Sequence, residues 1–313
     1  MKGTGQGDAV SRDDVAAQTR QLYAGIHERQ ITEETSTRLP GYLELIDLDV
    51  TGLNCLDLGA GSTARDAIRL ISAGAASVAL VDVGDAWMTT ARAELERHGI
   101  PAERYSLVDA TGWMAGDDGS RYDLITCSGV LHHMEDPDSA LTNVNMRLRP
   151  DGHFYLMVIG KGGLVRDFVM HTMRDLYASD SGFRSFMDGD PDAMLGTIRA
   201  GLHGLAVDRD RPLPAAYAQL LDLLSGGLDV DLMLTLKDRV NSPIYHEYDL
   251  AMATHLLESH GLRIVQRVYT APQFTNIRAI LEPVYSHPER PISRLLMGSG
   301  DLHLLATKAG RPH

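Results

Sequence analysis

The chain has little of several residue types that mark particular protein classes. It contains 2 cysteines, Cys55 and Cys127, each within a short apolar run. Thiols in such runs indicate small buried side chains in a reducing compartment, and two of them cannot build a cysteine-rich iron–sulfur cluster. No apolar run approaches the roughly 18–20 residues that cross a bilayer, and residues 1–14 lack the apolar stretch of a signal peptide. We therefore expect a cytoplasmic protein with no membrane partner.

Basic residues are also scarce. Lysine and arginine together number 29 against 42 aspartates and glutamates, which gives a formal net charge of −13. A protein that grips nucleic acid has to neutralise phosphates, so this balance disfavours a nucleic-acid partner. The 44% of hydrophobic residues and 23% of charged residues are typical of a folded globular chain. The composition therefore leaves two classes open, a soluble enzyme and a binding protein.

Short apolar runs alternate with amphipathic helical patterns from residue 53 onward. Strands buried on both faces and separated by helices are typical of a doubly wound, mostly parallel α/β sheet. Asp85 and Asp136 are expected to cap two of the helices, with Pro137 as the first residue of the second. The predicted strands cover residues 53–58, 77–82, 105–108, 122–127, 153–159, 262–269 and 302–307.

Two helical regions flank or interrupt this core. Residues 15–46 have a helical pattern with a break at residues 39–41, and the block after Gly160 contains helical patterns without a convincing strand. We predict an N-terminal helical segment (1–46) that closes the active site, a core (47–160 and 246–313) and a helical insertion (161–245). A long insertion is typical of a lid or substrate-binding cap; the alternative is an arm that joins copies in a homo-oligomer. Between the last two strands we expect an irregular stretch.

A glycine-rich turn follows the first strand, in the sequence Leu56-Asp-Leu-Gly-Ala-Gly-Ser-Thr63. Glycines there let the backbone approach a ligand and enter a helix whose N-terminus favours polar or anionic groups. Gly59, Gly61 and Ala64 also fit the dinucleotide fingerprint, with Asp82 about twenty residues further on. Nicotinamide binding therefore stays an alternative at this point.

Four further features favour a different ligand. Asp57 stands where a dinucleotide fingerprint is normally apolar, and its carboxylate suits an ammonium group. Asp109 and Ala110 end the third strand, the stretch from Ser128 to Asp136 follows the fourth, and residues 148–153 lead into the fifth. From residue 53 to about 159 this succession resembles the class I S-adenosylmethionine-dependent methyltransferases. The resemblance implies a seven-stranded sheet whose last strand is antiparallel, with S-adenosylmethionine across the carboxyl ends of the strands.

The resemblance also implies roles for individual residues. Gly59 and Gly61 would approach the methionyl part of the cofactor, with Asp57 reaching its amino group. Asp82 would accept from the ribose hydroxyls, and Asp109 from the adenine amino group. The predicted cofactor site comprises Asp57, Gly59, Ala60, Gly61, Asp82, Val83, Asp109, Ala110 and Ser128.

Candidates for the reaction itself follow the fourth strand and the helical block. Histidine can act as a base near neutral pH, and we assign a catalytic or acceptor-positioning role to His133, His132, Tyr245 and His246. Candidate substrate contacts are Tyr23, Lys161 and Arg166. The acids beside the histidine pair could suggest a metal site, but Asp136 is assigned to helix capping, so we predict no metal.

We therefore predict methyl transfer from S-adenosylmethionine to oxygen, nitrogen or carbon of a small molecule by in-line displacement. A second enzyme class stays open, in which the same cofactor is cyclised or donates its aminocarboxypropyl group. A nicotinamide-dependent oxidoreductase and a catalytically silent binding module are further alternatives.

Overall fold

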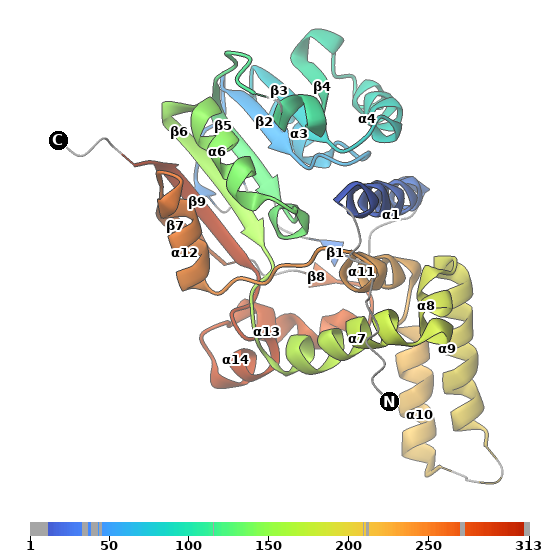
Figure 1. The fold of residues 1–313 in the computed structure, drawn as a ribbon. Coiled ribbons are helices and arrows are strands. Elements are labelled where there is room, and N and C mark those ends of the chain that lie inside the picture. The colour runs from blue at the N-terminus through green and yellow to red at the C-terminus, as the bar shows by residue number, and fades with distance from the viewer. Residues whose placement is uncertain are drawn as a thin grey trace, which may run out of the picture.

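The fold is built around one twisted sheet with helices on both faces (Figure 1). The structure, a computed structural model, describes residues 12–32, 37–38, 43, 46–114, 116–208, 210, 213–269 and 273–309. The sheet has 7 strands in the order β4-β3-β2-β5-β6-β9-β7, and β9 runs antiparallel to both of its neighbours. The strands are β2 (Asn54–Leu58), β3 (Ser77–Asp82), β4 (Tyr105–Asp109), β5 (Tyr122–Ser128), β6 (Leu148–Val158), β7 (Leu262–Val268) and β9 (Leu302–Lys308). The predicted fold class is confirmed.

Alternating side chains of the strands build two apolar cores, one on each face of the sheet. Cys55 faces the core that α3 (Arg65–Ser72) and α4 (Ala86–Arg97) cover, whereas Leu56 faces the other core. That second core is covered by α6 (Pro137–Arg147) and α12 (Leu250–Ser259), with the short α5 (Ala110–Met114) beside it. Burial on both faces explains why the strands read as continuous apolar runs.

The two predicted helix caps have different outcomes. Asp136 caps α6 as expected, because its Oδ1 accepts from the Ser139 backbone N–H at 2.9 Å, with Pro137 as first helical residue. Asp85 precedes α4, but its side chain makes no capping hydrogen bond, so that prediction was wrong. The backbone of Asp85 is already helical (φ −102°, ψ −21°), whereas a capping side chain needs an extended backbone to reach back.

The N-terminal helix α1 (Arg12–Thr32) packs against α4 and α11 (Val230–Val240), so it lies between the sheet and the helical block. The predicted helical pattern beyond it is wrong at residues 37–38. These form β1 (Thr37–Arg38), which pairs antiparallel with β8 (Gln273–Phe274) and gains its backbone hydrogen bonds from that distant strand. The break at residues 39–41 lies outside the described residues.

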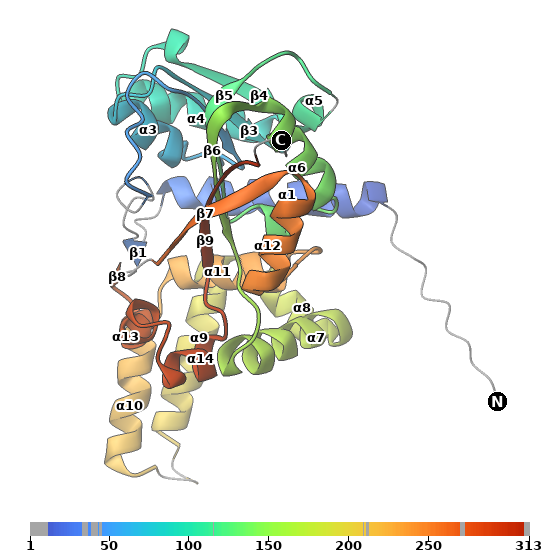
Figure 2. The same ribbon diagram turned by 90° about the vertical axis from the view of Figure 1, so that its left-hand side faces the viewer.

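The block after β6 is helical, as predicted, and it lies beyond the carboxyl ends of the parallel strands (Figures 1 and 2). Besides α11 it contains η3 (Leu164–Met170), α7 (His171–Ser179), α8 (Ser181–Asp188), α9 (Pro191–Ala206) and α10 (Ala215–Gly226). Its own core is rich in methionine, with Met170, Met187, Met194 and Met233 buried together. This arrangement places a separate apolar cluster opposite the edge of the sheet where ligands bind in open α/β folds.

The stretch between the last two strands is more regular than expected. It forms η4 (Ile277–Leu281), α13 (Glu282–Ser286) and α14 (Pro291–Met297), so the expectation of an irregular segment was wrong. Two prolines of this stretch, Pro283 and Pro291, stand in the first turns of α13 and α14, where a missing N–H costs nothing. None of the described helices is both long and apolar enough to span a bilayer.

Candidate active site

Three predicted carboxylates lie on adjacent strands at one edge of the sheet. Asp82 and Asp109 are register partners at the carboxyl ends of β3 and β4, and Asp57 lies on the neighbouring β2, one residue before its end. Parallel strands bring their carboxyl ends to the same edge, so acids far apart in sequence become neighbours. The structure therefore gathers the residues that sequence analysis assigned to the cofactor.

The glycine turn after β2 has the shape that the prediction requires. Gly59 and Gly61 have positive φ values of 84° and 61°, which glycine adopts without strain. The N–H of Gly59 donates to Val81 O at 2.7 Å, and a Cβ on Gly59 would overlap the side chain of Val130. Ala64, which is fully buried, also has a positive φ of 47°, a conformation that costs an L-residue roughly 1–2 kcal/mol.

Asp82 and Asp109 both hold the loops in which they stand. Asp82 accepts from the Gly61 N–H at 2.7 Å and from the Val83 N–H at 2.6 Å. Asp109 accepts from the N–H groups of Gly84 and Thr111 at 2.8 and 2.9 Å. The apolar side chain of Val83 is exposed between these acids. Half-buried acceptors on either side of an exposed apolar side chain fit an adenosine, whose ribose is polar and whose base is flat.

Asp57 is a buried acid inside the strand end. Its side chain is only 3% exposed, and its Oδ1 accepts from Thr126 Oγ1 at 2.8 Å. Burial, together with the nearby charge of Asp66, raises the pKa of Asp57 to about 8, against the opposing hydrogen bond from Thr126. A buried carboxyl group with a raised pKa is stabilised in its ionised form by a cation. Asp57 thus suits the ammonium group of S-adenosylmethionine, and Ala60 and Ser128 lie in the adjoining turn and strand end.

His132 and His133 form the short helix η2 (Leu131–His133) directly after β5, and both are buried. Nδ1 of His133 lies 3.0 Å from Ile244 O and 2.9 Å from Ser242 Oγ. Because a carbonyl oxygen only accepts, Nδ1 carries a proton, and Nε2 bears the lone pair in the neutral ring. Nε2 lies 3.6 Å from Asp238 Oδ1 and has no hydrogen-bond partner among the described residues.

The electrostatics around His133 keep the ring neutral in the free protein. Burial lowers its pKa below the usual range, and the carboxylate of Asp238 opposes that shift. Burial lowers the pKa of His132 still further. His133 is therefore a neutral base with an anion poised to stabilise its protonated form, the pattern expected of a general base.

Tyrosines from two other elements complete this cluster. The hydroxyl of Tyr23 in α1 donates to Asp238 Oδ1 at 3.1 Å, and its ring lies 5.6 Å from the His133 ring. The ring of Tyr245 lies 5.7 Å from that of His133, and its buried hydroxyl has no hydrogen-bond partner in the described part of the chain. His246 plays a different part, because its Nε2 donates to Met134 O at 3.2 Å. Tyr23, Tyr245 and both histidines of η2 thus come together, while His246 anchors the loop.

Comparison with known proteins decides the family. Residues 24–191, more than half of the chain, match the family of proteins with a methyltransferase domain. The chain belongs to this family. The predicted membership of the S-adenosylmethionine-dependent methyltransferases is confirmed, and the cofactor is S-adenosylmethionine. The acids and glycines at the strand ends stay its predicted binding residues.

Curated relatives of the methyltransferase are distant. The ubiquinone biosynthesis O-methyltransferase of Azotobacter vinelandii is 28% identical over 114 residues, which are 36% of this chain and 47% of the relative. An uncharacterized protein of Synechococcus sp. is 28% identical over 88 residues, which are 28% of this chain and 21% of the relative. The chain therefore spans half or less of the length of these relatives.

Two solved structures share the fold across nearly the whole chain. The 1,6-didemethyltoxoflavin-N1-methyltransferase of Burkholderia thailandensis, solved with 1,6-didemethyltoxoflavin and S-adenosylhomocysteine, is 17% identical with a TM-score of 0.50 and covers 96% of this chain and 91% of its own. PKMT2 of Rickettsia typhi is 14% identical with a TM-score of 0.53 and covers 93% of this chain and 54% of its own. At such low identity the likeness concerns the fold.

Sequence analysis of the methyltransferase missed Asp238 and Ser242. Asp238 lies in the last turn of α11 and Ser242 lies just after this helix. Both are more than a hundred residues away from His133 in the sequence, yet their side chains lie beside its ring. It also missed Arg174, whose guanidinium carbon lies 4.9 Å from the centre of the Tyr245 ring and whose Nη1 donates to Arg239 O at 2.7 Å. No local signal marks these residues, because they meet only when the helical block packs onto the end of β5.

The two predicted basic substrate contacts take different positions. Lys161 is exposed directly after β6, and its side chain stays a predicted contact. Arg166 is 1% exposed, forms an ion pair with Asp301 and donates to Gly160 O and Gly300 O. Arg166 is thus buried and not solvated. The engaged guanidinium joins the end of β6 to the start of β9 and argues against direct contact with an anionic substrate.

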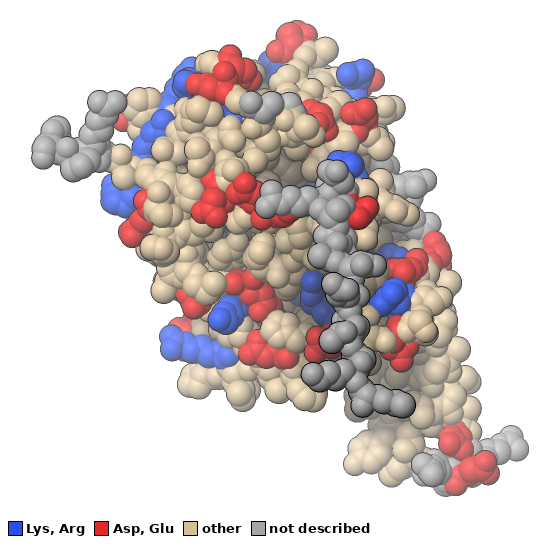
Figure 3. Space-filling view, in the orientation of Figure 1, with Lys and Arg blue, Asp and Glu red and all other residues tan. Residues whose placement is uncertain are grey.

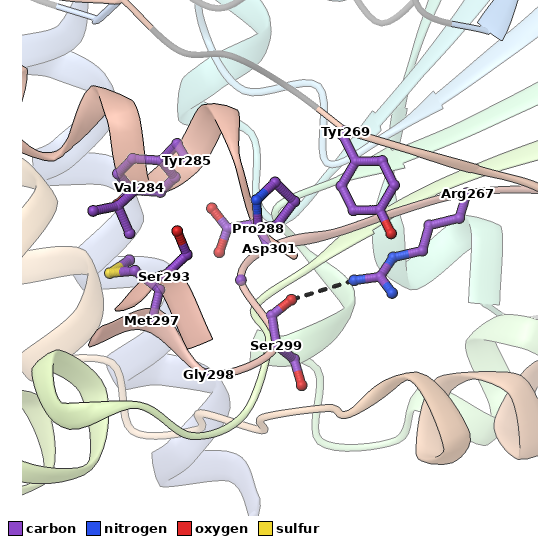
Figure 4. A pocket seen from close by; sticks show the side chains of 11 residues that line it. Arg267, Tyr269, Val284, Tyr285, Pro288, Ser293, Met297, Gly298, Ser299 and Asp301 are labelled. Atoms are coloured by element: carbon purple, nitrogen blue, oxygen red, sulfur yellow. Dashed lines mark hydrogen bonds between the residues drawn. The ribbon is translucent and has the colours of Figure 1, made fainter. Parts of the chain in front are cut away.

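A small pocket lies next to Asp301, at the edge of the sheet formed by β7 and β9 (Figure 4). Asp301 and the buried Ser293 face one another across it, and the Ser293 hydroxyl has no hydrogen-bond partner among the described residues. On the opposite wall, the Arg267 guanidinium carbon lies 4.9 Å from the centre of the Tyr269 ring. This pocket lies on the β7 side of the sheet, away from the strands that carry the cofactor acids.

One group of side chains is close enough together to hold a metal ion, although sequence analysis predicted no metal. Ligand atoms of Asp167, His171 and Glu247 lie within 4.8 Å of one another, with His171 Nε2 3.2 Å from Glu247 Oε2. Two of the three residues are exposed, and charged groups of this kind are common on surfaces without a metal. Among the acids beside His132 and His133, which sequence analysis also considered as metal ligands, Asp136 caps α6 as expected.

Proposed function

We propose that this methyltransferase transfers the methyl group of S-adenosylmethionine to a hydroxyl oxygen of a small molecule. The single observation that carries this is the buried, neutral His133 with Asp238 Oδ1 at 3.6 Å from its free nitrogen. A base is needed only where the attacking atom is protonated at the working pH, as a hydroxyl group is. The match to ubiquinone biosynthesis O-methyltransferases, named for modification at oxygen, supports the same reaction.

The residues of the chain provide a general base, orient the base and the acceptor, and exclude water from the site. When bound, the cofactor supplies an electrophilic methyl group on its sulfonium. Nε2 of His133 takes the hydroxyl proton as the oxygen attacks, and Asp238 stabilises the imidazolium that forms. Tyr23 fixes the carboxylate of Asp238 by donating to it, and the buried Tyr245 hydroxyl is available to hydrogen-bond the acceptor. Exclusion of water by α1 and α11 strengthens these interactions.

The size of the acceptor follows from where the base lies. His133 is 6% exposed, and Tyr23 of α1 and Asp238 of α11 stand beside it. A macromolecular side chain would have to displace these elements, whereas a small metabolite fits between them. We also assign the protein to the cytoplasm, because Cys55 and Cys127 are free, buried thiols on the neighbouring strands β2 and β5.

The decisive experiment uses methyl-deuterated S-adenosylmethionine, a metabolite extract and mass spectrometry of the products. We expect S-adenosylhomocysteine together with a metabolite that carries the deuterated methyl group on oxygen. Enzyme-dependent methylthioadenosine without a labelled acceptor would overturn the proposal in favour of attack elsewhere on the sulfonium. The matched control is His133→Asn, which should bind S-adenosylhomocysteine normally and form labelled product about 100-fold to 10,000-fold more slowly.

A further inference from the structure

Helices α9 and α10 form an arm, residues 191–226, that projects from the rest of the molecule (Figures 1 and 2). The two helices pack against each other, and α9 joins the arm to α11 at its base. Along residues 215–226 of α10 no side chain is buried. A helix of 12 residues depends on tertiary packing, and α10 packs mainly against α9, which leaves much of its surface uncovered.

The uncovered face of the arm is apolar. Tyr217, Leu220 and Leu223 follow one another at helical spacing on α10, and Leu223 is 69% exposed. Further exposed apolar side chains of the arm are Leu205, Val207 and Leu213. From their exposed fractions, these six residues present roughly 600 Å² of accessible surface, most of it apolar, which is comparable in area to the largest apolar patches of monomeric proteins. Figure 3 shows little basic colour on the visible face of this projection.

A strip of small residues runs along the other helix of the arm. Ala193, Gly196, Ala200 and Gly204 of α9 are spaced by three or four residues and are all exposed. A Cβ added to Gly196 or Gly204 would meet no atom within 4 Å, so the strip is not filled by α10. Small residues at this spacing leave a shallow groove into which side chains of another helix can pack.

Each arm carries both a ridge, formed by the apolar side chains of α10, and a groove, formed by the small residues of α9. The surface of one arm can therefore pair with the same surface of a second copy. We infer that the arm is a homodimer interface in which Tyr217, Leu220 and Leu223 of each copy pack into the small-residue groove of α9 in the other copy. A two-fold axis satisfies both contacts at once, because ridge meets groove twice. The result is a four-helix bundle, the packing that covers helices on two sides.

Area and charge select a second copy over other occupants. Two arms would bury roughly 1,200 Å² or more in total, which reaches the size of specific protein–protein interfaces. The only charged residue of α10 is Asp222, and the helix carries no lysine or arginine. Helices that bind membrane surfaces are rich in basic residues, so this helix does not suit an anionic bilayer.

The first test is sedimentation velocity of the full chain over a wide concentration range, with the substitution Leu223→Glu. We expect a dimer for the unaltered chain and at least a tenfold weaker dimer for the variant. Leu295→Glu is the matched control, since Leu295 is 61% exposed on α14, outside the arm, and should leave the dimer intact. A monomer at every concentration, or equal effects of both substitutions, would overturn the inference.

A second variant separates dimerisation from folding. Gly204→Leu fills the groove, has open space around it in its own protomer, and raises the helix propensity of α9. We expect this variant to be monomeric and to retain the helical content of the unaltered chain, because leucine favours the helix more than glycine does. If Gly204→Leu sediments as a dimer like the unaltered chain, α9 is not the surface that receives the partner, and the proposed pairing is wrong.

Discussion

The side chain of Val130 packs directly over the α-carbon of Gly59, leaving no room for a Cβ on that residue. Gly59 belongs to the turn after β2 that is predicted to bind the cofactor, and Val130 immediately precedes η2, which carries the histidine pair. The contact therefore joins the predicted cofactor turn to the element that carries the proposed base. It also gives a direct way to test how the two halves of the site depend on each other.

Gly59→Ala should destabilise the methyltransferase by about 2–4 kcal/mol, because it adds a clash to a left-handed backbone conformation. Urea unfolding measures the change in free energy. The clash alone should be relieved in the double variant Gly59→Ala/Val130→Ala, relative to the sum of the single changes, while the backbone strain persists. Additive effects would show that the Val130 contact does not limit position 59.

Asp57→Asn should make the cofactor-free protein more stable at pH 8. The raised pKa of about 8 means that folding forces the carboxyl group to keep a proton that the unfolded chain releases above its ordinary pKa of 3.8. Stability of the unaltered protein is therefore lost as the pH rises from about 4 to 8, and asparagine removes this loss. Thermal melts should show a gain for the variant that grows over this range and vanishes near pH 4.

The same substitution should abolish binding of S-adenosylhomocysteine. Because the neutral carboxyl group has to ionise to receive the ligand ammonium, binding to the unaltered protein should release a proton near pH 7. Calorimetry in buffers of different ionisation enthalpy measures that release. Proton-neutral binding, or unchanged affinity of Asp57→Asn, would contradict the assigned role; Asp66→Asn is the control that alters a neighbouring charge only.

Both His133→Asn and Asp238→Asn should lower kcat for an identified acceptor. We expect a loss of about 100-fold to 10,000-fold for His133→Asn and a smaller one for Asp238→Asn, which only stabilises the charged ring. Because burial lowers the pKa of His133, the acid limb of kcat/KM should lie below pH 6.5. In Asp238→Asn this limb should move to still lower pH, since the anion that favours protonation is gone. If the acid limb of kcat/KM stays at the same pH in Asp238→Asn, Asp238 does not influence the protonation of the base.

Arg166→Met should cost about 3–5 kcal/mol of folding free energy, because it leaves the charge of Asp301 without its buried partner. Denaturant titration measures this loss. The double variant Arg166→Met/Asp301→Asn should recover part of it, and the acceptor KM of the folded fraction should not change if Arg166 is structural. A large rise in KM at unchanged stability would instead restore Arg166 as a substrate contact.

The meeting of Asp57, Asp82 and Asp109 could be predicted because each lies at the carboxyl end of a strand or one residue before it. The ends of parallel strands meet at one edge whatever the rest of the chain does. Asp238 and Ser242 escaped prediction for the opposite reason. Their meeting with His133 depends on how α11 packs against η2, and helical periodicity shows which face of a helix is apolar without showing its neighbour. Similarly, β1 exists only because β8 lies beside it, and the stretch that was expected to be irregular contains α14, which begins at Pro291.

The loop that carries Tyr245 is fixed to the core by its main chain. His246 N donates to His132 O at 2.8 Å, Tyr248 N to Ile159 O at 3.0 Å, and Lys161 N to Tyr248 O at 2.8 Å. None of these bonds involves a side chain of the loop. Side chains facing the acceptor can therefore be exchanged without displacing the wall that presents them. If Tyr245 faces the acceptor as proposed, substitutions at position 245 are expected to change acceptor preference, in evolution or in the laboratory, while the proposed base His133 keeps its place.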